Sequence, residues 1–278
     1  MEQQESKKIR IKNALGKFKQ ILLNKKVDIS DLNKDHLDID GLFEKTLENH
    51  ILSYKISEDL PLLEFEQPIQ EITLDELVNS MGNAVDNTGN VRVWPSEEIL
   101  AYYIYINEDL RKSVLSQKRV LELGAGQSGL IGFMIGQLSI DNSDINIHIT
   151  DGNSKCVQNI FELLWTIDES EIPLHDTYDY IFISDCLFFQ DYHDALISTL
   201  KRLVNPIDGK IIIMAPKRGT TMQRFIDKAQ NDFNIEIDHC PQLQELMLSK
   251  LQKQFEEKSK DHDDMTPHLI TLNLKKTI

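Results

Sequence analysis

Cysteine is scarce in this chain of 278 residues. The three cysteines, Cys156, Cys186 and Cys240, lie far apart, and no two have the CxxC spacing of metal ligands. This count and spacing exclude a disulfide framework and give no pattern of zinc ligands, so we expect no metal site. The thiols are expected to be small buried apolar side chains, as free cysteines usually are. A reducing compartment suits such a chain, and we expect a cytoplasmic location, with the nucleus as a further compartment.

Long hydrophobic runs are lacking as well. No apolar run reaches the roughly 18 residues that a membrane-spanning helix needs, so we expect no such helix. The first five residues, Met1 to Glu5, are followed by no apolar stretch, so we expect no secretory signal. A hydrophobic content of 41% with 27% charged residues is ordinary for a globular protein.

Positive charge is scarce beyond the first 26 residues. The chain has a net charge of −15, and residues 1–26 hold eight lysines and arginines against two glutamates, which leaves −21 for the other 252 residues. Because nucleic-acid binding relies on basic surface, a body of this charge excludes nucleic acid as a partner.

The basic start of the chain has the pattern of an amphipathic helix over residues 7–24. Ile11, Leu15, Phe18 and Leu22 recur at helical spacing among lysines. Such a face resembles a helix that docks into the groove of an acidic partner. Packing of the same helix on the chain's own acidic body is an equal alternative. We assign residues 1–85 to an N-terminal extension of short helices and strands.

Strands and helices alternate from Trp94 onward. A helix is expected to begin at Pro95, with Ser96 as its N-cap and two glutamates in its first turn. Strands are expected at 119–123, 145–150, 180–184, 210–215, 233–238 and 268–274, and helices at 128–139, 154–167, 192–204, 220–232 and 243–258. This alternation predicts an α/β fold with a doubly wound, mostly parallel sheet, and we assign residues 86–278 to that domain.

A glycine-rich turn carries the strongest local pattern. Gly124, Gly126 and Gly129 follow a buried strand and let the backbone approach a ligand at a helix N-terminus. Asp151 closes the next strand and is placed to accept hydrogen bonds from both ribose hydroxyls. The pattern also fits a nicotinamide-dependent oxidoreductase. Glu122 favours another ligand, because an acid there suits the ammonium group of a methionine moiety and would repel a pyrophosphate.

Two further strand ends carry polar residues. Asp185 follows the strand at 180–184 and is expected to face the same crevice as the glycines, since ligands bind outside the carboxyl ends of such sheets. A helix cap is the alternative for Asp185, and both roles are compatible. Lys217 and Arg218 follow the next strand, and their side chains are either solvated or meet acidic groups of a partner.

Residues 85–103, with the run Asn87-Thr88-Gly89-Asn90 before Trp94-Pro95-Ser96-Glu97-Glu98, resemble the calmodulin-lysine N-methyltransferase family of seven-β-strand protein methyltransferases. The resemblance continues through 121–129, 150–153, 185–188 and 215–219 and covers about residues 80–278. It implies a Rossmann-like class I fold, S-adenosylmethionine as cofactor, and methyl transfer to a lysine of calmodulin, up to trimethyl-lysine. We expect a protein substrate, a monomer and no membrane partner.

The resemblance also implies roles for individual residues. Those expected to line the cofactor site, besides Glu122, are Trp94, Gly124, Ala125, Gly126, Asp151, Trp165 and Ser184, with Trp165 near the adenine. Asp185 and Phe188 are expected to border the substrate lysine as catalytic residues. An aspartate with an ordinary pKa near 4 is a poor base, so Asp185 is expected to orient the amine.

One departure from the family concerns the segment between Asp151 and Tyr180. It has only about 28 residues. A parallel crossover needs about a dozen residues or more, and Gly152–Ile160 is too short to supply a helix before Phe161–Trp165 could form a parallel strand. We therefore predict a single helix over Ser154–Ile167, no third strand, and the strand at 145–150 at the edge of the sheet. A catalytically impaired binding module stays an alternative to the enzyme for that reason.

Overall fold

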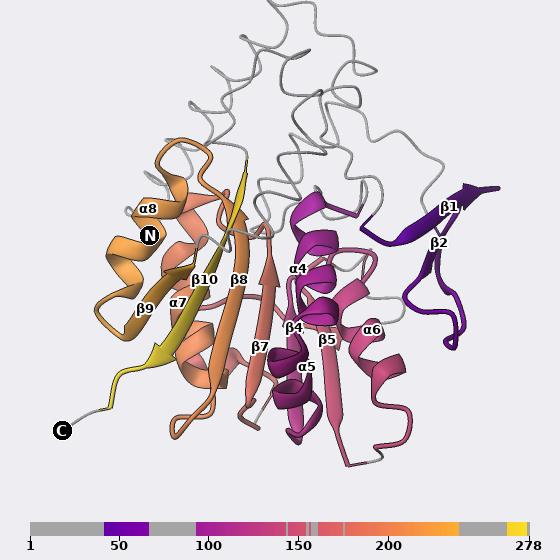
Figure 1. The fold of residues 1–278 in the computed structure, drawn as a ribbon. Helices are drawn as coiled ribbons and strands as arrows, with labels where there is room; N and C mark the ends of the chain where they lie inside the picture. Colours follow the sequence, from indigo (N-terminus) through magenta and orange to yellow (C-terminus); the bar gives the residue numbers. More distant parts are fainter. Residues whose placement is uncertain are drawn as a thin grey trace, which may run out of the picture.

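The computed structural model describes residues 42–66, 93–142, 144–153, 156, 161–174, 176–238 and 266–276 (Figure 1). The helices predicted at 7–24 and 243–258, and Cys240, lie outside the described residues. No helix in the described part of the chain has the length and apolarity needed to cross a membrane.

The described elements alternate as the sequence predicts. In chain order they are β1 (Glu44–Glu48), β2 (Ile51–Lys55), β3 (Leu63–Glu66), α4 (Pro95–Ile106), α5 (Glu108–Leu115), β4 (Arg119–Leu123), α6 (Leu130–Leu138), β5 (Asn146–Asp151), β6 (Phe161–Glu162), η3 (Glu169–Glu171), β7 (Tyr180–Ser184), η4 (Gln190–Tyr192), α7 (His193–Leu203), β8 (Lys210–Pro216), α8 (Thr221–Ala229), β9 (Phe233–Asp238) and β10 (Pro267–Leu274). The six strands predicted from Arg119 onward are all present, within two residues of their expected bounds.

Seven strands form one sheet in the order β6-β5-β4-β7-β8-β10-β9. Strands β6, β5, β4, β7 and β8 pair in parallel, whereas β10 lies antiparallel to both β8 and β9. The first strand of this sheet along the chain is β4, an inner strand. Strands β5 and β6 follow on one side of β4, and the strands from β7 onward lie on its other side. The sheet therefore confirms the doubly wound, mostly parallel, Rossmann-like α/β fold.

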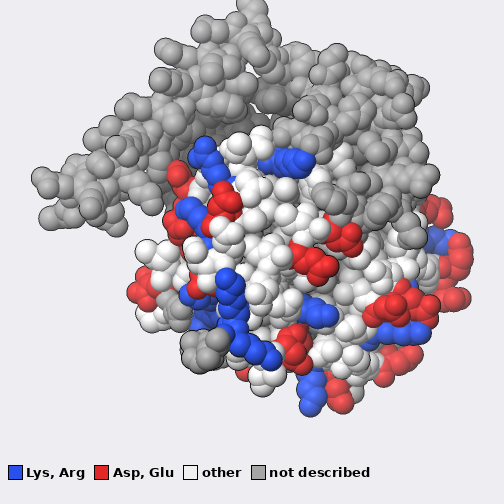
Figure 2. Space-filling view, turned by 60° about the vertical axis from the view of Figure 1, so that its left-hand side comes forward, with Lys and Arg blue, Asp and Glu red and all other residues white. Residues whose placement is uncertain are grey.

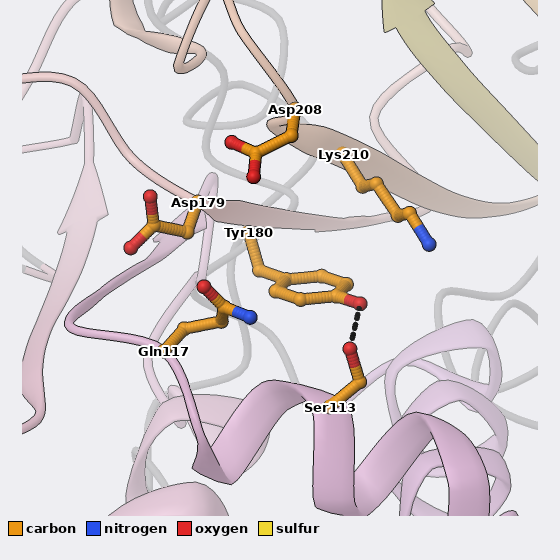
Figure 3. A pocket seen from close by; sticks show the side chains of 6 residues that line it. All are labelled: Ser113, Gln117, Asp179, Tyr180, Asp208 and Lys210. Carbon is orange, nitrogen blue, oxygen red and sulfur yellow. Dashed lines mark hydrogen bonds between the residues drawn. The ribbon is translucent and has the colours of Figure 1, made fainter.

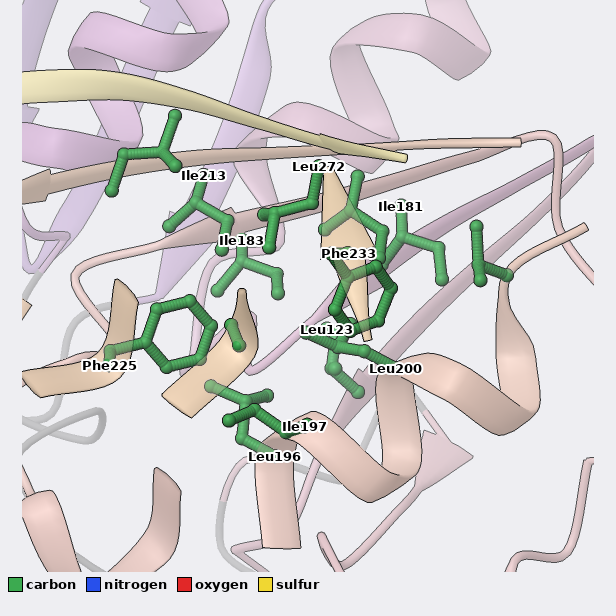
Figure 4. Close-up of a cluster of buried hydrophobic side chains, with 14 of the residues drawn as sticks. Leu123, Ile181, Ile183, Leu196, Ile197, Leu200, Ile213, Phe225, Phe233 and Leu272 are labelled. Carbon is green, nitrogen blue, oxygen red and sulfur yellow. The ribbon is translucent and has the colours of Figure 1, made fainter. Parts of the chain in front are cut away.

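Both faces of the sheet are buried under helices. Successive side chains of a strand point to opposite faces, so each strand contributes to both buried clusters. On β7, Tyr180 and Phe182 pack into the cluster that lies under α4 and α6, whereas Ile181 and Ile183 pack into the cluster under α7 and α8. Figure 4 shows the second cluster, in which Phe225 of α8 lies near the strand residues. The strands therefore read as continuous apolar runs, as strands covered on both faces do.

The third strand of the parallel half is present, and the prediction of one helix over Ser154–Ile167 is wrong. Strand β6 pairs with β5 through Thr150↔Phe161 and Asp151↔Glu162, so β6 is the sheet edge. The crossover argument failed because it assumed strands of ordinary length. A strand of two residues that pairs only with the last two residues of β5 requires little return along the sheet, and the nine residues between Asp151 and Phe161 suffice.

Helix α4 begins at Pro95, as the sequence predicts, but its N-cap lies two residues before the predicted Ser96. Trp94 is the N-cap, Pro95 occupies the first helical position, and no side chain caps the helix. Ser96 is 1% exposed and is not the cap. Proline suits the first turn because its missing N–H would have no helical partner there. Helix α5, which no sequence pattern predicted, begins where the Asn107 side chain accepts a hydrogen bond from the backbone N–H of Leu110.

Strands β1, β2 and β3 form a small antiparallel sheet that packs beside α4 and α6 (Figure 1). Its apolar residues Leu52, Tyr54 and Phe65 belong to the same core cluster as α4. The carboxylate of Glu98, on α4, accepts hydrogen bonds from the hydroxyl of Tyr54 at 2.5 Å and from the ammonium of Lys45 at 3.2 Å. The N-terminal extension is thus joined to α4 by both apolar and polar contacts.

Tyr54→Phe tests this attachment. The substitution keeps the buried ring but leaves the buried Glu98 carboxylate without the tyrosine hydroxyl, so the free energy of unfolding should fall by about 1–3 kcal/mol. Urea unfolding of the variant and of a Tyr105→Phe control measures the loss. Equal stability of the two variants would contradict the assigned role of the Tyr54 hydroxyl.

Candidate active site

The glycine loop lies between β4 and α6 and is fastened to the end of β5. Gly124, Gly126 and Gly129 have φ angles of 74°, 60° and 60°, which side-chain-bearing residues rarely adopt. The backbone N–H groups of Gly124 and Ala125 donate to the carbonyl of Thr150 at 2.9 and 3.0 Å. The loop therefore has the conformation that the sequence predicts and a fixed position at the carboxyl edge of the sheet.

Asp151, at the end of β5, faces the same loop. One carboxylate oxygen accepts the N–H of Gly126 at 2.8 Å, and the other accepts the N–H of Asn153 at 2.7 Å. A carboxylate offers about four lone-pair sites, so one such group can accept several donors at once. The aspartate is positioned by the backbone on both sides.

Trp165 and Cys186 lie over the first glycine. A Cβ atom added at Gly124 would stand 2.7 Å from the sulfur of Cys186 and 3.2 Å from the ring of Trp165. Only glycine leaves room for this contact. The loop thus meets the segment after β6, which carries Trp165, and the segment after β7, which carries Asp185 and Cys186. The structure brings together three segments that the sequence predicts to share one edge.

Glu97 joins the start of α4 to the start of α6. Its carboxyl group is 3% exposed, and one oxygen accepts the hydroxyl of Ser128 at 2.6 Å and the N–H of Leu130 at 2.8 Å. The first N–H groups of a helix have no partner within it, and a carboxyl group satisfies them. Glu97 therefore fixes the end of the glycine loop, at Ser128 and Leu130, to the first turn of α4. Burial raises the pKa of Glu97 to about 7, although the bonds from Ser128 and Leu130 oppose that shift.

Glu122 lies beneath the loop and not at its open surface, which corrects the interpretation that it contacts an ammonium group. Its side chain is 2% exposed, and one oxygen accepts the N–H of Gly132 in α6 at 2.7 Å. Alternation along β4 explains this, since Glu122 shares the face of Val120, which is covered by α4 and α6. Burial raises the pKa of Glu122 well above its usual range, and the neighbouring Glu97 adds to the effect. The group therefore favours its neutral form.

Asp185 forms an ion pair with Arg218. The guanidinium donates from Nε to one carboxylate oxygen at 3.2 Å and from an Nη to the other at 2.7 Å. The same guanidinium lies 5.3 Å from the centre of the Phe188 ring. Burial raises the pKa of Asp185, and the charge of Arg218 opposes that rise. The alternative in which Asp185 caps α7 is wrong, because Tyr192 occupies that N-cap and no side chain caps the helix.

Aromatic side chains surround this ion pair. The ring of Phe188 is 45% exposed, and its centre lies 4.7 Å from that of Phe189, edge to face. His193 is buried, and its Nε2 lies 3.0 Å from the carbonyl oxygen of Leu187, which holds the loop before α7. Burial lowers the pKa of His193, so the imidazole is neutral near pH 7. Phe188 is thus presented on a fixed loop next to Asp185.

Two predicted site residues have more peripheral places. Trp94 contributes its backbone carbonyl, which accepts the N–H groups of Glu97 and Glu98 at the start of α4. Ser184 contributes its carbonyl, which accepts the Cys186 thiol at 3.1 Å. Arg218 and Glu97 are the residues that sequence reasoning missed as site components. Arg218 was accessible to reasoning in principle, since it and Asp185 both follow neighbouring strands of one parallel sheet.

A cavity of about 250 Å³ lies at the opposite, amino-terminal ends of β7 and β8 (Figure 3). It is lined by Ser113, Gln117, Asp179, Tyr180, Asp208 and Lys210. The hydroxyl of Tyr180 lies 2.8 Å from that of Ser113, and Asp179 accepts the backbone N–H of Arg119. These are contacts that hold β7 to its neighbours. Because ligands of such sheets bind at the carboxyl ends of the strands, this cavity is not the candidate site.

A metal centre and a basic nucleic-acid surface are two other kinds of site to consider in the described residues. No three His, Cys, Asp or Glu side chains among them are grouped as a metal site. On the face that Figure 2 presents, lysines and arginines are interspersed with acidic side chains. Several are paired with acids, as in Lys201–Asp232 and Lys228–Asp194, both at 2.7 Å. This mixed surface differs from the single-sign basic patch that nucleic-acid binding uses.

Comparison with known families gives a match over residues 73–232 to a family described as lysine methyltransferase. A curated relative, calmodulin-lysine N-methyltransferase of Arabidopsis thaliana, is 31% identical over 166 residues, which are 53% of this chain and 52% of the relative. The chain therefore spans about half the length of the relative that it matches.

Solved structures give more distant likenesses. A TehB-like SAM-dependent methyltransferase of Corynebacterium glutamicum has 12% identity and a TM-score of 0.39, covering 57% of this chain and 80% of that one. The N-methyltransferase NodS of Bradyrhizobium japonicum has 11% identity and a TM-score of 0.37, covering 63% and 91%. The fold assignment rests on the strand order described above.

S-adenosylmethionine is the cofactor of a lysine methyltransferase, and the residues at this edge fit it. The fit is one of donors, acceptors and shape: a loop whose glycines carry no side chains, a carboxylate at the end of β5, and the Trp165 ring packed against Gly124. Such a set accommodates a nucleoside with two ribose hydroxyls and a flat base.

Glu97→Gln tests the buried carboxyl under the loop. A pKa raised on folding means that Glu97 stabilises the fold at pH below about 4.5, and that this stabilisation is lost as pH rises through about 7. Glutamine keeps an acceptor for Ser128 and Leu130 but does not ionise. The free energy of unfolding should then fall less between pH 5 and 8, by an amount of the order of 3 kcal/mol.

Denaturant unfolding across that pH range, with Glu66→Gln as an exposed control, measures the difference. Parallel profiles for the wild type and Glu97→Gln would contradict the assigned cost of ionising this group.

Proposed function

Because the chain belongs to the lysine methyltransferase family, we propose that it transfers methyl groups from S-adenosylmethionine to a lysine of another protein, and that this protein is calmodulin. The observation that carries the proposal is the meeting of three segments over Gly124: the glycine loop, the segment of Trp165 and the segment of Asp185. The glycine loop, proposed to hold the cofactor, then shares one edge of the sheet with the polar and aromatic side chains of Asp185 and Phe188.

The cofactor is held, in this proposal, by the residues at the ends of β4, β5 and β6. Asp151 accepts the ribose hydroxyls, and Trp165 contacts the base. The backbone of Gly124, Ala125 and Gly126 approaches the amino-acid part, with Trp94 and Ser184 at the border of the site. When bound, the cofactor supplies an electrophilic methyl group.

The substrate lysine is received beside the Asp185–Arg218 pair and the exposed ring of Phe188. A free lysine has a pKa of about 10.4, so presenting it as a neutral amine near pH 7 costs roughly 4–5 kcal/mol. Holding the amine in the reactive orientation can supply roughly 7–11 kcal/mol. Asp185 orients the amine through its carboxylate, and water takes the proton.

Methylation up to trimethyl-lysine, which the family resemblance of the sequence implies, is part of the proposal. Each added methyl group makes the nitrogen larger, and the third makes it permanently charged. The exposed ring of Phe188 and the adjoining ring of Phe189 offer apolar walls with π faces to such a cation.

The proposed activity is tested by incubating the full chain with calmodulin and radiolabelled S-adenosylmethionine, followed by mass spectrometry of the modified lysine. Label should enter calmodulin at one lysine. Asp185→Asn should lower kcat sharply, because an orienting group is lost, while the cofactor dissociation constant stays within about threefold. An Asn variant as fast as the wild type would remove Asp185 from the site, and absence of label would favour a binding module without activity.

The cofactor assignment predicts that Asp151→Ala weakens S-adenosylmethionine binding. Loss of each unreplaced charge-assisted hydrogen bond should cost roughly 1.5–3 kcal/mol, which raises the dissociation constant about tenfold or more. Asp144→Ala, ahead of the same strand, is the matched control. Calorimetric titration measures both, and an unaltered affinity of Asp151→Ala would show that the ribose is held elsewhere.

A further inference from the structure

The guanidinium of Arg218 occupies the space between Asp185 and Phe188. It makes two hydrogen bonds to the carboxylate and lies over the aromatic ring. The side chain of Arg218 is only 24% exposed and that of Asp185 only 10%, so water screens their attraction weakly. A planar, permanently charged group in this two-point contact has a fixed orientation.

The backbone directs these two side chains toward each other. Asp185 and Arg218 have φ angles of 50° and 43°, a left-handed conformation that is uncommon for residues other than glycine. They stand at the ends of the adjacent strands β7 and β8, and the N–H of Asp185 donates to the carbonyl of Met214 at 2.9 Å. Unfavourable backbone conformations persist where surrounding contacts impose them, and they cluster at functional sites.

The pair presents no net charge. Arg218 forms an ion pair with Asp185 at 2.7 Å and opposes the effect of burial on the Asp185 pKa. A bare carboxylate beside the substrate lysine would stabilise its ammonium form, since an opposite charge within about 4–6 Å raises the pKa of an amine by roughly 1–3 units. The ammonium form has no lone pair and cannot accept a methyl group. A carboxylate that is to orient the amine therefore needs a counter-ion.

We propose that Arg218 is a positioning residue of the methyl-transfer site: by neutralising and orienting Asp185, it lets the site receive the substrate lysine as a neutral amine. The inference rests on the proposed function and assigns to it a residue that acts through Asp185. The proton leaves the lysine to bulk water before the amine enters, and Arg218 itself neither gains nor loses one.

The pH dependence of kcat on calmodulin tests this role. Arg218→Gln leaves Asp185 uncompensated, so the inflection of kcat should move about one pH unit or more to the alkaline side. At neutral pH kcat should then fall about tenfold, while KM stays equal or falls because the ammonium form binds the free carboxylate. Asp185→Asn leaves Arg218 uncompensated and should move the inflection to the acid side, and the double variant should return it toward the wild-type position.

Arg218→Lys and Arg224→Gln are the matched variants. Lysine restores the charge without the two-point geometry, so the inflection should stay near that of the wild type with a lower kcat. Arg224 lies six residues further along, within α8, and donates to Gln190, so its loss removes a guanidinium without touching Asp185. Calorimetric binding of S-adenosylmethionine shows which variants are folded.

Coinciding inflections for the wild type, Arg218→Gln and Asp185→Asn would overturn the role of Arg218. If Arg218→Gln does not fold, the acid shift of Asp185→Asn carries the test, and its absence is equally decisive. Absence of methyl transfer by the wild type would instead overturn the proposed function. Carbon-13 titration of the Asp185 carboxyl gives a readout apart from activity, since its pKa should rise in Arg218→Gln and an unchanged pKa would contradict the pairing.

Discussion

The carboxyl group of Glu97 holds together the part of the molecule on which the candidate site is built. By accepting the Ser128 hydroxyl and the Leu130 N–H, it fixes the first turn of α6 against the first turn of α4. The glycine loop ends at that turn, and its other end is bonded to Thr150 of β5. Glu98, one residue further along α4, points in another direction and holds the N-terminal sheet through Tyr54 and Lys45. Two consecutive glutamates thus connect the extension, the helix pair and the loop.

The acids at this edge are each compensated in a different way. Asp151 is satisfied by two backbone N–H groups, and Asp185 by the guanidinium of Arg218. Burial favours the neutral forms of Glu97 and Glu122. In a chain whose residues after the first 26 carry a net −21, none of these four groups stands as a bare anion. The site therefore gains fixed acceptors without a strongly negative field that would hold a substrate lysine in its ammonium form.

Much of the fold was predictable because both faces of the sheet are covered. Strands such as Tyr180–Ser184 and Lys210–Pro216 are continuous apolar runs between turn residues, and their order follows from the alternation with helices. Strand β6 was missed because a strand of two residues shows no hydrophobic periodicity. It pairs with only Thr150 and Asp151 of β5. The cap at Ser96 was wrong because proline at the first helical position already sets the helix start.

The site was predictable where its residues act through the backbone or at strand ends. The glycines and Asp151 lie where their spacing placed them, whereas Glu122 was misread because the alternation along β4 was not applied to it. The contacts Glu97–Ser128 and Asp185–Arg218 join residues 31 and 33 positions apart and depend on tertiary packing. Local patterns contain no information about such pairs until the strand order is known.

Calorimetric titration of the chain with S-adenosylmethionine and, separately, with NAD tests most directly whether this edge is a methyltransferase site. The account predicts saturable binding of one S-adenosylmethionine per chain and no binding of NAD, since the proposed site of the loop, Asp151 and Trp165 takes one S-adenosylmethionine. Binding of NAD without S-adenosylmethionine would contradict it in favour of an oxidoreductase, and binding of neither would reduce the fold to a module without cofactor.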